Sequence, residues 1–162
     1  MVRAVTDRPR DVPPRTQPGP AGQPAPAASD SPDWMPADGH TPFRVLVVDD
    51  VAELRLLVRT LLEDERDIEL LDAGDGAEAV SLVGTHPVDL VIMDMYMPVM
   101  DGLEATHAIR SADAPPEVVA FTSSIDGRLN EAFLAEGAAA HFDKGEMTSL
   151  IAYIKAAARS PR

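Results

Sequence analysis

From residue 43 onward, the chain alternates between short apolar runs and longer stretches whose apolar residues recur at helical spacing. The apolar runs predict five strands, at residues 44–48, 68–71, 88–93, 118–121 and 139–142. The periodic stretches predict five helices, at residues 53–64, 76–83, 102–111, 128–136 and 147–158. In the first of these helices, one face carries Leu54, Leu57, Val58, Leu61 and Leu62. The alternation favours an α/β fold, with a parallel sheet covered by helices on both faces.

Residues 1–42 have a different composition. They hold ten of the fifteen prolines, with four Arg, five Asp and only isolated apolar residues. Such a segment cannot form a packed core, so we predict a disordered Pro/Ala-rich N-terminal tail, followed by one domain at residues 43–162. The spaced prolines favour polyproline II, which either invites a partner or serves as a spacer. Trp34 and Met35 are the one aromatic–apolar pair in the tail, and they either dock on the domain or have no role.

The charge and composition argue against several functions. Residues 43–162 hold ten Lys or Arg against 22 Asp or Glu, in a chain of net charge −13. Direct nucleic-acid binding needs a basic face, so we expect none. The chain has no cysteine, which excludes disulfides and thiolate metal sites. No run approaches the roughly 20 apolar residues of a membrane span, and no secretory signal is present, so we expect a cytoplasmic protein without membrane insertion.

Polar residues follow several of the predicted strands. Asp49 and Asp50 follow the first strand, Asp94 the third, Thr122 the fourth and Lys144 the fifth. The carboxyl ends of parallel strands meet at one edge of a sheet, where ligands bind in such folds. Three carboxylates gathered there repel one another unless a cation lies among them.

This set of side chains fits the chemistry of phosphoryl transfer. Mg²⁺ prefers oxygen ligands from a few carboxylates, water and phosphate. Asp50 and Asp94 suit direct ligation, and Asp49 suits ligation directly or through water. Lys144 and Thr122 would stabilise the oxygens of the transferring group, because catalysis of this kind is mostly positioning and charge neutralisation.

Each of these residues also has an ordinary structural explanation. A single Asp at a strand end is most often a turn residue or a helix N-cap, and Asp49 and Asp50 stand just before a predicted helix. Thr122 alone would be a common strand-end hydroxyl, and Lys144 alone a surface charge. The combination with Asp94 is what favours a phosphorylation site over capping.

The residues of this set lie in four segments that resemble the response regulator receiver domain. They are Val47-Val48-Asp49-Asp50, Asp94-Met95-Tyr96-Met97-Pro98-Val99-Met100-Asp101-Gly102, Ala120-Phe121-Thr122-Ser123 and Phe142-Asp143-Lys144-Gly145. The resemblance covers about residues 43–160. It implies a flavodoxin-like doubly wound (βα)5 fold with a five-stranded parallel sheet in the order 2-1-3-4-5, which is the order known for members of this family.

The resemblance also implies roles for individual residues. Asp94 would accept a phosphoryl group from a phosphohistidine on a sensor kinase. Asp49, Asp50, Asp94 and the backbone carbonyl of Tyr96 would coordinate Mg²⁺. Thr122 would move toward the phosphoryl group when the domain switches.

Three positions depart from the family pattern. Gly145 follows Lys144 where many receivers have proline, so that loop is expected to move more freely. His141 stands where the family often has a Tyr or Phe that swings inward on activation, and it either fills that space or senses pH. Tyr96 is bulky at a position that influences dephosphorylation rate in this family.

The leading hypothesis is therefore a single-domain response regulator without an output domain, which catalyses only its own phosphorylation and dephosphorylation. Its partners would be a sensor histidine kinase or histidine phosphotransfer protein, and an unidentified downstream protein. The alternative is a constitutive, non-phosphorylated adaptor on the same fold. An Asp-nucleophile phosphatase is disfavoured, because Tyr96 stands where such enzymes have a second Asp. A dinucleotide enzyme is disfavoured because no G-x-G-x-x-G follows the first strand.

Overall fold

The computed structural model describes residues 41–123 and 127–160. The strands are β1 (Phe43–Val48), β2 (Ile68–Ala73), β3 (Leu90–Met93), β4 (Glu117–Thr122) and β5 (Ala140–Asp143). The helices are α1 (Ala52–Leu62), α2 (Gly76–Thr85), α3 (Gly102–Arg110), α4 (Gly127–Ala135) and α5 (Met147–Arg159), with a 3-10 turn, η1 (Lys144–Glu146), before α5. Ten of these eleven elements were predicted from the sequence, and the exception is the short turn η1.

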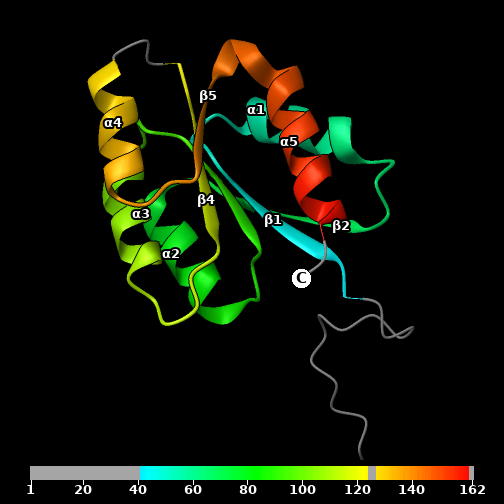
Figure 1. Cartoon of the computed structure of the whole chain (residues 1–162), viewed down its shortest axis with the longest axis horizontal. Coiled ribbons are helices and arrows are strands. Elements are labelled where there is room, and N and C mark those ends of the chain that lie inside the picture. Colours follow the sequence, from blue (N-terminus) through cyan, green and yellow to red (C-terminus); the bar gives the residue numbers. More distant parts are fainter. Residues whose placement is uncertain (1–40, 124–126, 161–162) are drawn as a thin grey trace, which may run out of the picture. The chain divides into compact units, whose positions relative to one another are not determined.

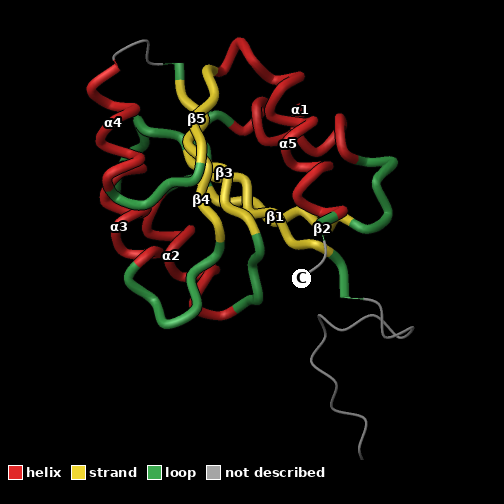
Figure 2. The backbone as a smooth tube through the Cα atoms, in the orientation of Figure 1, coloured by secondary structure: helices red, strands yellow, loops and turns green. Residues whose placement is uncertain are grey.

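The strands form one parallel sheet in the order β2-β1-β3-β4-β5, which confirms the predicted flavodoxin-like topology. Helices α2, α3 and α4 cover one face of this sheet, and α1 and α5 cover the other (Figure 1). Figure 2 shows the strands as a central layer between the two groups of helices. Because all five strands are parallel, their carboxyl ends lie at one edge of the sheet. The polar residues that follow β1, β3, β4 and β5 are therefore brought to that edge.

Successive residues of the central strands are buried on opposite faces, which produces two apolar clusters. The cluster beneath α1 and α5 contains Val45, Val47, Val58, Leu62, Leu90, Ile92, Val119, Phe121, Leu150 and Ile154. The cluster beneath α2, α3 and α4 contains Leu46, Val48, Ala73, Ala79, Val91, Met93, Met95, Ala105, Ile109, Val118, Ala120, Phe133 and Ala138. Burial on both faces explains why the strands appear in the sequence as nearly continuous apolar runs.

The apolar face expected on α1 is only partly buried. Val58 and Leu62 are buried and Leu54 is half-buried, but Leu57 and Leu61 are 46% and 43% exposed. Leu54, Val58 and Leu62, spaced four residues apart, form the narrow row that contacts the sheet and α5. The neighbouring row, with Leu57 and Leu61, faces outward. The five side chains that share one helical face therefore divide into a row that packs on the sheet and a row that is largely exposed.

Every element differs from its predicted range by one or two residues at one end or both. β3 begins at Leu90 and not at residue 88, because the side chain of Asp89 accepts a hydrogen bond of 2.7 Å from the backbone N–H of Arg44. β2 continues to Ala73, two residues beyond the predicted end.

The proline-rich part of the predicted tail, with Trp34 and Met35, lies outside the described residues. In the parts of the chain that are described, no helix has the length and apolarity needed to cross a bilayer.

Val99 in the loop after β3 has a left-handed backbone conformation, with φ of 71°, and its side chain is 85% exposed. A β-branched side chain is strained in this region, whereas asparagine tolerates it. We expect Val99→Asn to raise the free energy of unfolding by about 1 kcal/mol, as measured by urea denaturation. Leucine also disfavours this conformation, so Val99→Leu should raise the free energy of unfolding less than Val99→Asn does. Equal increases in the two variants would contradict the account.

Candidate functional site

Asp94 is held at the carboxyl edge of the sheet by backbone contacts. It directly follows β3, its N–H donates to the carbonyl of Val48 at 2.9 Å, and it is 4% exposed. The first turn of α3 packs closely against it, because a Cβ atom on Gly102 would lie 1.9 Å from the carbonyl oxygen of Asp94. The side chain of Asp101 caps this helix by accepting from the N–H of Glu104 at 2.9 Å. The Asp-Gly pair therefore fixes the backbone beside Asp94.

Asp49 and Asp50 come from the neighbouring strand. The pairing of Val48 with Met93 brings the ends of β1 and β3 side by side. Asp49 is buried and Asp50 is exposed, and ligand oxygens of these two residues and Asp94 lie within 4.8 Å of one another. The N-cap of α1 is Val51, which makes no side-chain capping bond within the described part of the chain. Capping therefore does not account for Asp50, while Asp49 accepts from the N–H of Val51 at 2.9 Å.

Lys144 links the two buried carboxylates. Its Nζ lies 2.7 Å from Oδ2 of Asp49 and 3.1 Å from Oδ2 of Asp94. The turn that carries it is held by a capping box in which the side chain of Asp143 accepts from Gly145 N–H at 2.7 Å and Glu146 accepts from Asp143 N–H at 3.0 Å. Proline in place of Gly145 would have no N–H to donate. In this chain, Gly145 thus contributes a hydrogen bond that fixes the position of Lys144.

The negative charge of the three carboxylates is only partly balanced by Lys144. Burial has the largest effect and raises the pKa of Asp94, the hydrogen bond and charge of Lys144 lower it, and the charge of Asp49 raises it again, so that the pKa lies above its ordinary value. Burial alone would lower the pKa of Lys144, but the hydrogen bonds and charges of Asp49 and Asp94 together hold it above its ordinary value. One ammonium facing three carboxylates leaves the cluster negative, so an additional cation is favoured there.

The residues present fit a magnesium ion. They supply hard oxygen donors from three carboxylates, one of them exposed, which leaves coordination positions open to water and phosphate oxygens. The side chain of Tyr96 is 60% exposed and lies in the loop that follows Asp94. A role for its backbone carbonyl as a further ligand remains a prediction.

Thr122 and His141 lie on β4 and β5, the two strands beyond β3. Thr122 is the last residue of β4, and its buried hydroxyl has no hydrogen-bond partner among the described residues. His141 lies in β5 opposite Ala120 of β4, so it faces the same side of the sheet as Thr122. Asn130 of α4 also has a buried, unpartnered side-chain oxygen.

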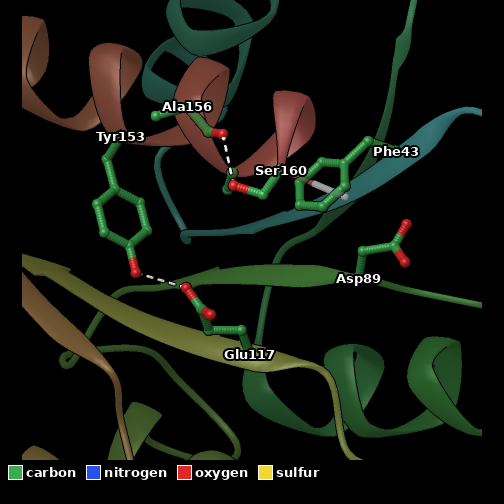
Figure 3. Close-up of a pocket in the computed structure, with 7 residues that line it drawn as sticks. Phe43, Asp89, Glu117, Tyr153, Ala156 and Ser160 are labelled. Carbon is green, nitrogen blue, oxygen red and sulfur yellow. Dashed lines mark hydrogen bonds between the residues drawn. The ribbon is translucent and has the colours of Figure 1, made fainter. Parts of the chain in front are cut away.

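A cavity of about 360 Å³ lies at the opposite edge of the sheet, where β1, β3 and β4 begin. It is lined by Phe43, Asp89, Glu117, Tyr153, Ala156, Ala157 and Ser160, several of which are shown in Figure 3. The Tyr153 hydroxyl points at Glu117 and donates to it at 2.5 Å (Figure 3). None of the carboxylates at the carboxyl edge borders this cavity. The acidic cluster and the cavity therefore lie at opposite edges of the sheet.

The contact between Tyr153 and Glu117 makes stability depend on pH. Burial, then the bond to Glu117, raises the pKa of Tyr153 to about 12. A pKa raised on folding gives stability that is present below the ordinary tyrosine value and is lost as the pH rises through about 12. We expect Tyr153→Phe to lose about 1 kcal/mol at neutral pH in urea unfolding. The difference from the wild type should disappear in strong alkali, and a difference that grew with pH would contradict this account.

The doubly wound sheet, with carboxylates and a lysine at its carboxyl edge, defines a class of α/β domains built around an acidic pocket. A family model of the response regulator receiver domain matches residues 45–155. The chain therefore belongs to the response regulator receiver domain family, which serves two-component signalling.

Individual relatives agree with this assignment. The chemotaxis protein CheY of Halobacterium salinarum is 42% identical over 80 residues, or 49% of this chain and 66% of that protein. A protein-glutamate methylesterase/protein-glutamine glutaminase of Methanosarcina mazei is 40% identical over 90 residues, or 55% of this chain. The response regulator domain of Thermotoga maritima CheB superposes with a TM-score of 0.65 at 26% identity, covering 75% of this chain and 99% of that domain. This chain spans only 25% of the methylesterase, so the esterase activity remains a property of that relative.

Proposed function

We propose that this chain is a phosphorylation-dependent switch in which Asp94 accepts a phosphoryl group from a phosphohistidine. The observation that carries the proposal is the pair of contacts from Lys144 Nζ, at 2.7 and 3.1 Å, to two buried carboxylates. A buried acid whose pKa is raised, beside a fixed ammonium and two further acids, is costly for a stable fold and useful for transferring a charged group. The donor would be a sensor histidine kinase or a histidine phosphotransfer protein.

In the transfer step, a carboxylate oxygen of Asp94 forms a bond to phosphorus. The phosphorus–nitrogen bond to the donor imidazole breaks, and that imidazole leaves as the neutral base after taking up a proton. The ammonium of Lys144, which contacts the free carboxylate of Asp94, would then contact and stabilise the phosphoryl oxygens. Asp49, Asp50, Asp94 and the Tyr96 carbonyl would hold Mg²⁺, which supplies charge neutralisation and orientation of the phosphoryl group.

The response to phosphorylation would start at Thr122. Its hydroxyl is buried and unpartnered among the described residues, so a phosphoryl oxygen on the neighbouring strand end offers it an acceptor. Movement of Thr122 toward Asp94 would shift the surface formed by α4, β5 and α5 between two arrangements. A downstream protein would read that surface.

The proposal is tested by incubating the full chain with acetyl phosphate and Mg²⁺ and measuring its intact mass. We expect a gain of one phosphoryl group that disappears when EDTA removes the metal. A wild-type chain whose mass does not change, with folding verified by circular dichroism, would refute phosphoryl acceptance and favour a constitutive adaptor.

A further inference from the structure

Arg55, the fourth residue of α1, reaches back to the loop that carries the acid pair. Its backbone N–H donates to the carbonyl of Val51 at 3.3 Å, as the helix requires. Its half-buried guanidinium donates to the backbone carbonyl of Asp49. Helical side chains point toward the helix N-terminus, which is why this residue can contact one that precedes the helix.

The carbonyl that Arg55 contacts belongs to the peptide unit between Asp49 and Asp50. A peptide unit is planar, so a donor held against its oxygen orients the whole unit and, with it, the Cα atom of Asp50. The other two acids of the cluster, Asp49 and Asp94, are buried and are contacted by Lys144 at 2.7 and 3.1 Å. Asp50 is the exposed member of the three, so the direction of its carboxylate depends on its backbone.

The guanidinium of Arg55 also lies against the loop that follows β2. A Cβ atom on Gly74 would lie 4.0 Å from a guanidinium nitrogen of Arg55 and 3.7 Å from Oε2 of Glu78. The same carboxylate accepts from the N–H of Gly74 at 2.7 Å, which places a fixed negative charge on this side of the loop. A planar guanidinium between two loops keeps its donors in one orientation better than a flexible ammonium would.

The charge and the hydrogen bond of Arg55 would have opposite effects on a cation at the cluster. A positive charge near the acids repels a second cation, so loss of the charge alone would tighten metal binding. Loss of the hydrogen bond would free the peptide unit before Asp50 and weaken metal binding. The sign of the change therefore separates the two roles.

We propose that Arg55 is a positioning residue for the cation site, and that its bond to the Asp49 carbonyl aligns Asp50 with Asp49 and Asp94 around one divalent ion. The inference rests on the proposed function, because it needs a metal ion at the acidic cluster. Arg55 acts through the backbone and is assigned no direct contact with the ion.

The test measures Mn²⁺ binding to the full chain from the loss of the paramagnetic resonance signal of the free ion. Mn²⁺ takes the same oxygen ligands as Mg²⁺. Arg55→Met should weaken binding about fivefold, the usual value of one hydrogen bond. Arg59→Met is the matched control, because Arg59 lies one turn further along α1 and pairs with Asp72 at 2.5 Å. It loses the same charge and should bind Mn²⁺ no more weakly than the wild type.

A double-mutant cycle shows whether Arg55 acts through Asp50. Once Asp50→Asn has removed the carboxylate, adding Arg55→Met should cause no further loss of affinity. A fivefold loss that persists in the Asp50→Asn background would show that Arg55 only supports the fold, and would overturn the inference. If Arg55→Met does not fold by circular dichroism, Arg55→Lys takes its place: it keeps the charge and should still bind Mn²⁺ more weakly, and wild-type affinity would overturn the inference.

The remaining outcomes separate this inference from the proposed function. Unchanged or tighter Mn²⁺ binding in Arg55→Met, with the wild type labelled at Asp94 by acetyl phosphate, would refute the positioning role alone. A folded wild type that neither binds Mn²⁺ nor accepts a phosphoryl group would refute the proposed function, and the positioning role would fail with it.

Discussion

Asp94→Asn should abolish phosphoryl acceptance while making the fold more stable. The amide keeps the shape of the side chain but cannot form the acyl phosphate, so acetyl phosphate with Mg²⁺ should leave the intact mass unchanged. It also removes one of three neighbouring carboxylates in a buried site. We expect the free energy of unfolding at neutral pH to rise by roughly 1 kcal/mol, as is common when a functional residue is removed.

The pH dependence of this gain follows from the direction of the shift. Burial raises the pKa of Asp94 in the folded chain. Any stability from this group is therefore present below the ordinary carboxyl pKa and is lost as the pH rises through the folded-state value. At neutral pH the ionised carboxylate costs stability, so the gain from Asp94→Asn should shrink as the medium becomes acidic. Urea unfolding without metal at neutral and acidic pH measures this, and a variant less stable at neutral pH would contradict it.

Lys144→Met should have the largest effect on stability. It leaves the buried carboxylates of Asp49 and Asp94 without the ammonium that contacts both of them. We expect a loss of about 3 kcal/mol in metal-free solution, the cost of removing one partner from a buried ion pair. Mg²⁺ should raise the melting temperature of this variant more than that of the wild type, because the metal no longer competes with Lys144 for the same oxygens.

Lys155→Met provides a matched control for the same chemical change. Lys155 is paired with Glu65 at 2.7 Å on a partly exposed part of α5, and such a pair contributes less than about 1 kcal/mol. Its melting temperature should respond to Mg²⁺ as the wild type does. Equal losses in the two lysine variants, or no added response to Mg²⁺ in Lys144→Met, would show that Lys144 does not neutralise the acidic cluster.

The fold and the centre of the site were predictable because they depend on local patterns. Apolar runs separated by periodic stretches imply parallel strands, and parallel strands bring the residues that follow them to one edge. Asp49, Asp94 and Lys144 were assigned in this way, and the structure brings them into contact. The strand order, the role of Asp94 as phosphoacceptor and the Tyr96 carbonyl as a metal ligand came from resemblance to a family and not from the pattern.

Other features depend on tertiary packing and could not be predicted. Leu57 and Leu61 carry the same apolar signal as Leu62, and only the position of α1 on the sheet decides which of them is buried. The bond between Tyr153 and Glu117 joins residues 36 positions apart.

The most direct test of the central claim is to locate the phosphoryl group chemically. The chain is labelled with acetyl phosphate and Mg²⁺, the acyl phosphate is reduced with borohydride to give homoserine, and the peptides are mapped by mass spectrometry. We predict homoserine at position 94 and unmodified aspartate at positions 49 and 50. Homoserine at either of those two positions, or at no position in a chain that has been shown to be folded, would contradict the assignment of Asp94 as the phosphoacceptor.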